Sequence, residues 1–177
     1  MTIEDIAAAM QRVESVLRRR PATAIHDDAP ATAQWQTGLR VVARDANGVQ
    51  LVTDMPSELG GSGEHVTPGW LFRAGLASCL ATRIAMGAAT AGIELTSLEV
   101  SASSRSDVRG LFGMADVSGT PVGAGPREVQ LLVKISAPGV SAEKLQTLVE
   151  DSSRCSPISA AARDVVPVAL RIEVGDA

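Results

Sequence analysis

Two cysteines are the residues of this sequence whose types and neighbours could do chemistry. Cys79 is followed four positions later by Arg83, which lies on the same face if the segment is helical. Cys155 follows Arg154 and precedes a helix expected to start near Pro157, and a helix N-terminus carries partial positive charge. Positive charge favours the thiolate, which is the nucleophilic form of cysteine. Two such thiols within bridging distance would suit peroxide reduction, in which one becomes a sulfenic acid and the other condenses with it to a disulfide.

The same residues leave other interpretations open. A free cysteine is a common small apolar residue of buried helices, so both thiols could be inert. The only two histidines, His26 and His65, have no metal-ligand spacing with each other or with the cysteines, and we predict no metal site and no bound cofactor. His65 lies a few residues before the segment that carries Cys79, so a Cys–His hydrolase is a further alternative.

The segment that must position Cys79 is predicted to be a long buried helix over residues 68–91. Pro68 suits its first turn, and Gly92 suits its end. Apolar and small residues occur nearly all round it, which is typical of a helix in a protein core. Two arginines interrupt the apolar run, which stays below the roughly 18 residues that a membrane span needs. We therefore expect a core helix and no membrane association.

The other elements follow from local patterns. We predict a helix over residues 2–20, with a capping box formed by Thr2 and Asp5. Further along the chain we expect a hairpin with arms 35–43 and 49–53 around Asn47-Gly48, a loop over 55–67, strands at 95–103 and 129–135, helices at 141–154 and 156–165, and a final strand at 168–174. Strands and helices do not alternate regularly, so the fold class is α+β. Residues 1–31 are expected to form an N-terminal helix and linker, and residues 32–177 one domain.

Composition excludes several functional classes. The chain has 177 residues, a formal net charge of −4 and 2% aromatic residues with no tyrosine, so no stacking surface for nucleic acid is expected. Its acidic start lacks the apolar stretch of a secretory signal. Two cysteines do not make a disulfide framework, and a reducing, cytoplasmic compartment is therefore expected.

Four stretches of the sequence resemble the OsmC/Ohr family, the osmotically inducible and organic hydroperoxide resistance proteins. The segment ELGGSGEHVTPGWLFRAGLASC, Glu58 to Cys79, is similar to the one that enters the family's central helix and carries its first cysteine. The later SDVRGLFG (106–113), the helix at 143–154 and CSPIS (155–159) follow in the family's order. The resemblance covers roughly residues 32–174.

This resemblance implies a fold and an activity. The fold would be an intertwined homodimer in which two long central helices are wrapped by antiparallel sheets. The activity would be that of a cysteine-based peroxidase, a peroxiredoxin-like oxidoreductase of oxidative stress defence, which reduces organic hydroperoxides and is itself reduced by a dithiol or a protein-bound lipoyl group. Cys79 would be the nucleophile, Cys155 the resolving thiol, and Arg40 the arginine that holds the thiolate, with Arg44 as the alternative match.

Two positions depart from the family pattern. The glutamate at the helix entrance falls on Gly69, and the second cysteine falls on Ser156, so Cys155 comes one residue early. One residue at a helix start turns a side chain by about 100°. These departures motivate a second hypothesis, in which the protein keeps the fold, has lost peroxidase activity and acts as a small-molecule-binding or scaffold dimer.

Overall fold

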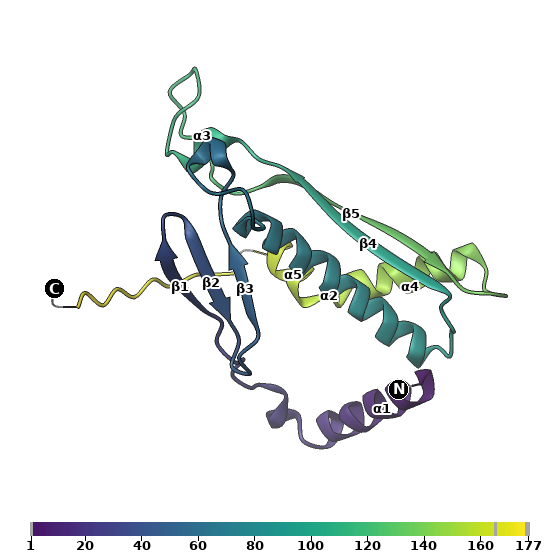
Figure 1. Ribbon diagram of the computed structural model, residues 1–177. Coiled ribbons are helices and arrows are strands. Elements are labelled where there is room, and N and C mark those ends of the chain that lie inside the picture. The colour runs from purple at the N-terminus through teal and green to yellow at the C-terminus, as the bar shows by residue number, and fades with distance from the viewer. Residues whose placement is uncertain (1, 165, 176–177) are drawn as a thin grey trace.

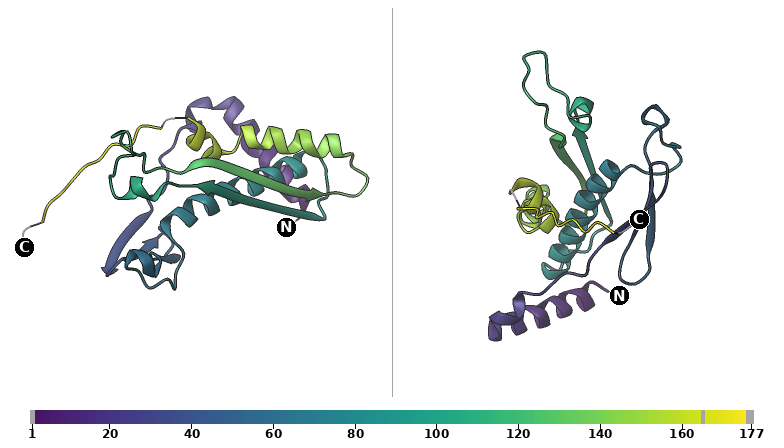
Figure 2. Two further views of the ribbon diagram at one scale, coloured as in Figure 1. Left: turned by 90° about the horizontal axis from the view of Figure 1, so that it is seen from above. Right: turned by 90° about the vertical axis from the view of Figure 1, so that its left-hand side faces the viewer.

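The structure is a computed structural model that describes residues 2–164 and 166–175. Its longest helix, α2, lies in the middle, with the remaining elements arranged around it (Figure 1; Figure 2). The elements in chain order are α1 (Ile3–Arg19), η1 (Pro21–Ala24), β1 (Thr32–Thr37), β2 (Arg40–Arg44), β3 (Gln50–Thr53), η2 (Ser57–Leu59), α2 (Pro68–Thr90), β4 (Ser97–Arg105), α3 (Val108–Leu111), β5 (Arg127–Ser136), α4 (Ala142–Arg154) and α5 (Pro157–Arg163). The mixture of helices and antiparallel strands confirms the predicted α+β class.

The central helix α2 begins at Pro68, as predicted, and the residue before it caps its first turn. The Thr67 hydroxyl accepts a hydrogen bond from the backbone N–H of Trp70, and Pro68 occupies the first helical position, where no N–H is needed. Gly92 follows the helix end with φ +63°, a conformation that favours glycine. Three side chains one turn apart are almost fully buried and anchor the helix in the core: Leu76, Leu80 and Ile84.

The first sheet has the order β1-β2-β3, and both pairings are antiparallel. The predicted single arm at 35–43 is wrong, because the chain reverses at Gly38 and forms β1 and β2 instead. Gly38 has φ +57°, and its carbonyl accepts a hydrogen bond from the Trp35 indole, which closes the turn. The predicted turn at Asn47-Gly48 is confirmed, with Gly48 at φ +85°.

A second sheet and two helices enclose other sides of α2. The long strands β4 and β5 pair antiparallel, with Leu98 opposite Ile135, and β4 packs along α2 (Figure 1). Helices α4 and α5 pack on α2 as well, and a small core gathers between these elements around Ala88, Ile93 and Leu145. The predicted N-caps at Ser141 for α4 and at Thr2 for α1 are both confirmed by their hydrogen bonds.

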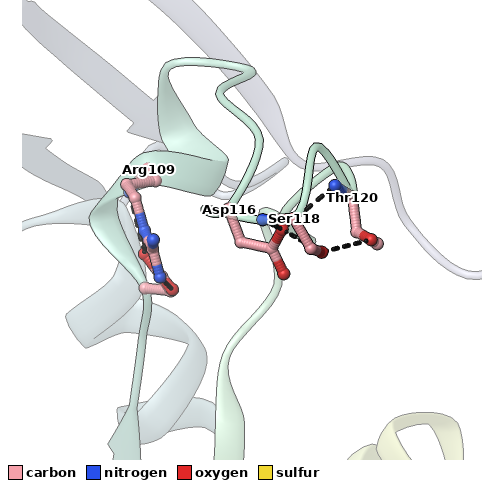
Figure 3. Close-up of polar contacts among 5 residues, drawn as sticks. Arg109, Asp116, Ser118 and Thr120 are labelled. Carbon is pink, nitrogen blue, oxygen red and sulfur yellow. Dashed lines mark hydrogen bonds and ion pairs between the residues drawn. The ribbon is translucent and has the colours of Figure 1, made fainter.

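The excursion between β4 and β5 is held by local hydrogen bonds. Asp107 caps α3 and pairs with Arg109 at 2.7 Å, and the hydrogen bonds from that guanidinium lower the pKa of Asp107 to about 2. Figure 3 shows the next turn, where Asp116 accepts hydrogen bonds from Ser118 and Thr120. These bonds, the one from the Ser118 hydroxyl above all, lower the pKa of Asp116. These local hydrogen bonds therefore hold the turns of the excursion, while Leu111, Phe112 and Met114 beside them are exposed.

The C-terminal segment differs from its prediction. Residues 166–175 run away from the body of the molecule as extended chain and form no strand (Figure 1). Its apolar side chains are exposed, namely Val166, Val168, Leu170, Ile172 and Val174. The helix predicted to reach Val165 ends at Arg163, and Val165 itself lies outside the described residues. The alternating pattern is present in the sequence, but residues 166–174 pair with no strand among the described residues.

No helix in the described part of the chain combines the length and apolar character that crossing a membrane requires.

The N-terminal helix α1 lies against the C-terminal half of α2, where the Thr90 hydroxyl donates a hydrogen bond to Met10 Sδ at 3.4 Å. The chain therefore packs its first helix on its own central helix.

Candidate functional site

Cys79 lies on the face of α2 that α4 and α5 cover. Positions 75, 79, 83 and 87 recur every four residues and so lie along one side of the helix. The Cys79 side chain is partly buried there, and its thiol is free. The site is therefore built around a sulfur at a helix–helix contact, partly shielded from water.

One glycine allows α4 to approach α2 closely. A Cβ at Gly87 would lie only 2.9 Å from Leu148 Cδ1 and 3.1 Å from Ser152 Oγ of α4. At Gly75 a Cβ would make an ordinary contact with Ile158 Cδ1 of α5, at 3.5 Å. A side chain at Gly87 would require α4 to shift, so this glycine sets how near α4 comes to α2.

Ser156 contacts the sulfur. This residue joins α4 to α5, its side chain is fully buried, and its hydroxyl donates a hydrogen bond to Cys79 Sγ at 3.3 Å. The buried Ser159, one turn into α5, donates in turn to Ser156 Oγ at 3.1 Å. Among the described residues, Ser156 is the hydrogen-bond partner of the Cys79 sulfur.

Cys155 occupies the neighbouring position with a different environment. It is the C-cap of α4, where its backbone N–H bonds to the carbonyls at the end of that helix. Its side chain is exposed and its thiol is free, whereas the next side chain, that of Ser156, points to Cys79. The offset of one residue noted in the sequence thus separates an exposed thiol from a buried hydroxyl.

Arg40 lies at the start of β2 and pairs with Glu64 in the loop that leads into α2. The Arg40 Nη2 to Glu64 Oε2 distance is 3.5 Å, and both side chains are substantially exposed. Arg44, the alternative match, donates instead to Gln34 on the neighbouring strand at 2.8 Å. Of the two arginines, Arg40 is the one linked to the loop before the Cys79 helix.

The loop that carries Glu64 is organised by Asp54. This carboxylate is buried and accepts hydrogen bonds from the Ser62 hydroxyl and from the backbone N–H groups of Met55 and Ser62. These bonds, the one from the Ser62 hydroxyl first, lower the pKa of Asp54. Gly61 is required at the same place, because a Cβ there would lie 1.8 Å from the carbonyl oxygen of Met55.

The position of Gly69 is partly filled by an arginine. A Cβ at Gly69 would meet Arg73 Nη1 at 3.8 Å, so this guanidinium lies beside the place where the family pattern has a glutamate. Arg73 Nη1 also donates to Ser104 Oγ on β4 at 3.5 Å. The helix entrance therefore carries a cation beside the glycine.

A separate pocket of about 620 Å³ opens between α1, α2 and α4. Arg83 and Lys144 line it together with hydroxyl-bearing residues, among them Thr90 and Ser152. Arg83 Nε is buried without a hydrogen-bond partner among the described residues, while Arg83 Nη1 donates to Met86 Sδ at 3.9 Å. Glu143 and Asp151 line the pocket as well, so its wall carries both signs of charge.

Sequence reasoning missed the role of Ser156. The pair Ser156-Pro157 predicts an N-cap, and the helix does begin at Pro157, but the Ser156 hydroxyl makes no capping bond. The signal that could have identified its partner was the family resemblance, which places the second cysteine on Ser156. In the described part of the chain, no cluster of three or more His, Cys, Asp or Glu residues could hold a metal ion.

Comparison with known families gives one match. The family model described as OsmC-like protein matches residues 61–171, which is more than half of the chain and includes both Cys79 and Ser156. A comparison with curated proteins gives no match.

Solved structures with the same fold include several hydroperoxide resistance proteins. The organic hydroperoxide resistance protein of Elizabethkingia anophelis, with thiocyanate bound, is 27% identical with a TM-score of 0.58, and the match covers 80% of this chain and 91% of that one. The OsmC-like protein of Mycoplasma pneumoniae is 18% identical with a TM-score of 0.65, with coverage of 80% and 91%. OhrB of Bacillus subtilis, an organic hydroperoxide resistance protein, is 22% identical with a TM-score of 0.50, with coverage of 78% and 93%.

Proposed function

Because this chain belongs to the OsmC-like family, we propose that it is a thiol-dependent peroxidase that reduces organic hydroperoxides, with Cys79 as its nucleophile. The observation that carries the proposal is the environment of the Cys79 sulfur. It is partly shielded, it is held on a rigid helix, and it accepts a hydrogen bond from a buried hydroxyl. A hydrogen bond donated to a sulfur stabilises the anionic form more than the neutral one.

The first chemical step follows from this arrangement. The Cys79 thiolate attacks the terminal oxygen of R–O–OH, an S–O bond forms as the O–O bond breaks, and the alkoxide leaves and takes up a proton. The products are a cysteine sulfenic acid and an alcohol. The sulfur is oxidised by two electrons, and the peroxide is reduced by two.

Arg40 is the residue that we propose to stabilise the thiolate and orient the peroxide. It is tied through Glu64 to the loop that enters α2, and a guanidinium offers several N–H donors to an anion. Its ion pair with Glu64 is long and exposed, and such pairs contribute little energy, so Arg40 can exchange Glu64 for another partner at small cost.

The cycle is completed by a reductant, which we propose to be a dithiol or a protein-bound lipoyl group. A thiol must attack the sulfenic acid, release water and leave a disulfide that the reductant then opens. The family resemblance predicts Cys155 as the attacking thiol, which stays untested, and a thiol of the reductant itself is the alternative. Such a cycle suits a reducing compartment, and we expect the protein in the cytoplasm.

We also propose that the active protein is a homodimer. Eight apolar side chains are buried among the described residues, which is a small core for a chain of this length. Trp35, Trp70 and Leu132 are exposed, as is the whole apolar face of residues 166–174. Exposed apolar surface of this extent is typical of a protein interface, and a second copy would supply the missing strand partner for the C-terminal segment.

A second candidate function is ligand binding without turnover, by a dimer of the same fold. Gly69 favours it, because the helix entrance lacks the family's carboxylate and holds the Arg73 guanidinium instead. The pocket at Arg83 offers a place for a polar small molecule, because cationic and carboxylate side chains line it together. This candidate predicts that Cys79 resists both mild peroxide and alkylation in the native protein.

The experiment that separates the two candidates is turnover of cumene hydroperoxide with a dithiol reductant. We expect the wild type to consume the hydroperoxide and Cys79→Ser to fall to the background rate. Ser78→Ala is a matched control, because the Ser78 hydroxyl bonds to the Gly75 carbonyl on α2 itself. Turnover that survives Cys79→Ser would overturn the assignment of the nucleophile, and a wild type without turnover would favour the binding protein.

A further inference from the structure

Ser156 stands where a serine normally caps a helix, but its hydroxyl is used elsewhere. The residue immediately precedes α5, has an extended backbone (φ −85°, ψ 112°) and is followed by proline, as at a usual N-cap. Its side chain nevertheless makes no capping hydrogen bond. The hydroxyl is directed at Cys79 Sγ instead, at 3.3 Å. The helix start therefore gives up a local interaction in favour of the sulfur.

The hydroxyl has a fixed direction. Ser159 donates to Ser156 Oγ, and a hydroxyl carries one hydrogen, so the Ser156 hydrogen is free to go to the sulfur. Both serines are buried, with exposed fractions of 0% and 5%, so water does not compete for these groups. A chain of two hydroxyls that ends on sulfur suits an acceptor with excess charge, which is a thiolate.

The same geometry keeps the second thiol of the chain away from this contact. Cys155 is exposed at the end of α4, whereas the group that reaches Cys79 from the α4–α5 junction is the Ser156 hydroxyl. An oxygen at this position can hold the sulfur but cannot form a disulfide with it. The junction is therefore arranged to position Cys79 and lacks a sulfur with which to resolve it.

We propose that Ser156 is a positioning residue for the Cys79 sulfur and that the Cys79 sulfenic acid is resolved by an external thiol, in a one-cysteine cycle. The inference rests on the proposed function, because it concerns the fate of the sulfenic acid formed there. In the resolving step the sulfur of a small or protein-bound dithiol attacks Cys79 Sγ. An S–S bond forms, the S–O bond breaks, and the hydroxyl leaves as water with the proton of the attacking thiol. The second thiol of the reductant then attacks the reductant sulfur that is bonded to Cys79. The mixed disulfide breaks, and Cys79 leaves as the thiolate.

A gain-of-function variant tests the geometry. Ser156→Cys in a Cys155→Ser background puts a thiol where the hydroxyl contacts Cys79 and leaves no other cysteine. The wild type, Cys155→Ser and the double variant are each treated with one equivalent of cumene hydroperoxide in the presence of dimedone, which traps sulfenic acids. Intact mass and thiol counting then report the product.

We expect the dimedone adduct in the wild type and in Cys155→Ser, and an internal disulfide without adduct in the double variant. A Cys79–Cys155 disulfide in the wild type, with no adduct, would overturn the one-cysteine cycle. A double variant that reacts with peroxide but keeps two titratable thiols or the adduct would overturn the placement of residue 156.

The failure of the proposed function is distinguishable from these outcomes. If no protein of the set reacts with hydroperoxide, the peroxidase proposal is overturned and the cycle with it. Treatment of the double variant with diamide, which oxidises neighbouring thiols without peroxide, tests the contact alone. A disulfide in this arm supports the placement of residue 156, and two remaining thiols contradict it.

The positioning role has its own readout in Ser156→Ala. We expect the rate of Cys79 alkylation by iodoacetamide at neutral pH, measured in the Cys155→Ser background, to fall about tenfold, and Ser156→Thr, which keeps a hydroxyl, to restore most of it. Ser152→Ala is the matched control, because Ser152 is also a buried serine of this helix interface but donates to the Arg83 carbonyl at 3.4 Å. A rate that falls equally in Ser156→Ala and Ser152→Ala, or in neither, would overturn the positioning role.

Discussion

The surroundings of Cys79 and those of Arg40 are built in different ways. Cys79 is held by packing: Gly87 lets α4 approach α2 closely, and a buried hydroxyl contacts the sulfur. Arg40 is held by a long ion pair with Glu64 on an exposed three-stranded sheet. The surroundings of Cys79 are thus packed within one chain. The surroundings of Arg40 leave the guanidinium and nearby apolar side chains exposed. The difference suggests that a second copy completes the site.

The largest expected effect concerns this open side. Leu170→Asp with Ile172→Asp places two charges on the exposed apolar face of the C-terminal segment. Burying unpaired charges is costly, so we expect the dimer to dissociate and the mass measured by light scattering to fall to that of one chain. Arg171→Ala is the control, because this side chain lies between the two and pairs with Glu173. An unchanged mass in the double variant would exclude the segment from the interface.

The next largest expected effect is on stability and concerns the loop over residues 55–67, which leads from the sheet of Arg40 into the helix of Cys79. Gly61→Ala would place a Cβ 1.8 Å from a backbone carbonyl that cannot move alone. We expect a loss of about 3 kcal/mol in the free energy of unfolding, at the upper end for overpacking. The measurement is urea denaturation, with Gly69→Ala as the control, because a Cβ there makes an ordinary contact at 3.8 Å. Equal stabilities of the two variants would contradict the close approach at Gly61.

Substitutions of Arg40 and Arg44 test the proposed role of the β2 arginines in the peroxide reaction. Arg40→Met removes the donor that we propose to stabilise the reacting groups, and we expect the rate of the peroxide step to fall about 100-fold. Arg44→Met removes a similar charge from the same strand but breaks only the contact with Gln34. We expect little change there in stopped-flow measurements of peroxide reduction. A larger loss in Arg44→Met would transfer the role to Arg44.

The smallest expected effect is the pH dependence that comes from Asp54. Its pKa is lowered from the ordinary 3.8 by hydrogen bonds to the ionised form. Its contribution to stability is therefore fully present above about pH 4 and is lost as the pH falls through the lowered value. We expect the Tm of the wild type to fall more between pH 6 and pH 2.5 than that of Asp54→Asn. Parallel curves for the two proteins would contradict this contribution.

Much of the fold could be predicted because its signals are local. The predicted helix starts near Thr2, Pro68 and Ser141 are all confirmed, and each is capped by a side chain within three residues of the N–H group that it accepts from. The turn at Gly48 has an equally local cause. The turn at Gly38 was missed because its glycine stands inside an otherwise continuous strand pattern.

The rest depends on contacts between distant residues. The alternation over 168–174 is typical of a strand with one apolar face, but a strand also needs a partner. The part of the chain that the structure describes provides no partner for this segment. Cys79 could be identified from its helix and the family resemblance, but the hydroxyl against its sulfur comes from 77 residues further along the chain. The local sequence predicts that this hydroxyl caps a helix. It contacts the Cys79 sulfur instead because α5 packs on α2.

The most direct test of the central claim is to locate the oxidised sulfur. The wild-type protein is treated with one equivalent of cumene hydroperoxide and dimedone, and its peptides are mapped by mass spectrometry. We expect the adduct on Cys79 and none on Cys155. An adduct on Cys155 alone, or no oxidation of either thiol, would contradict Cys79 as the peroxidatic nucleophile.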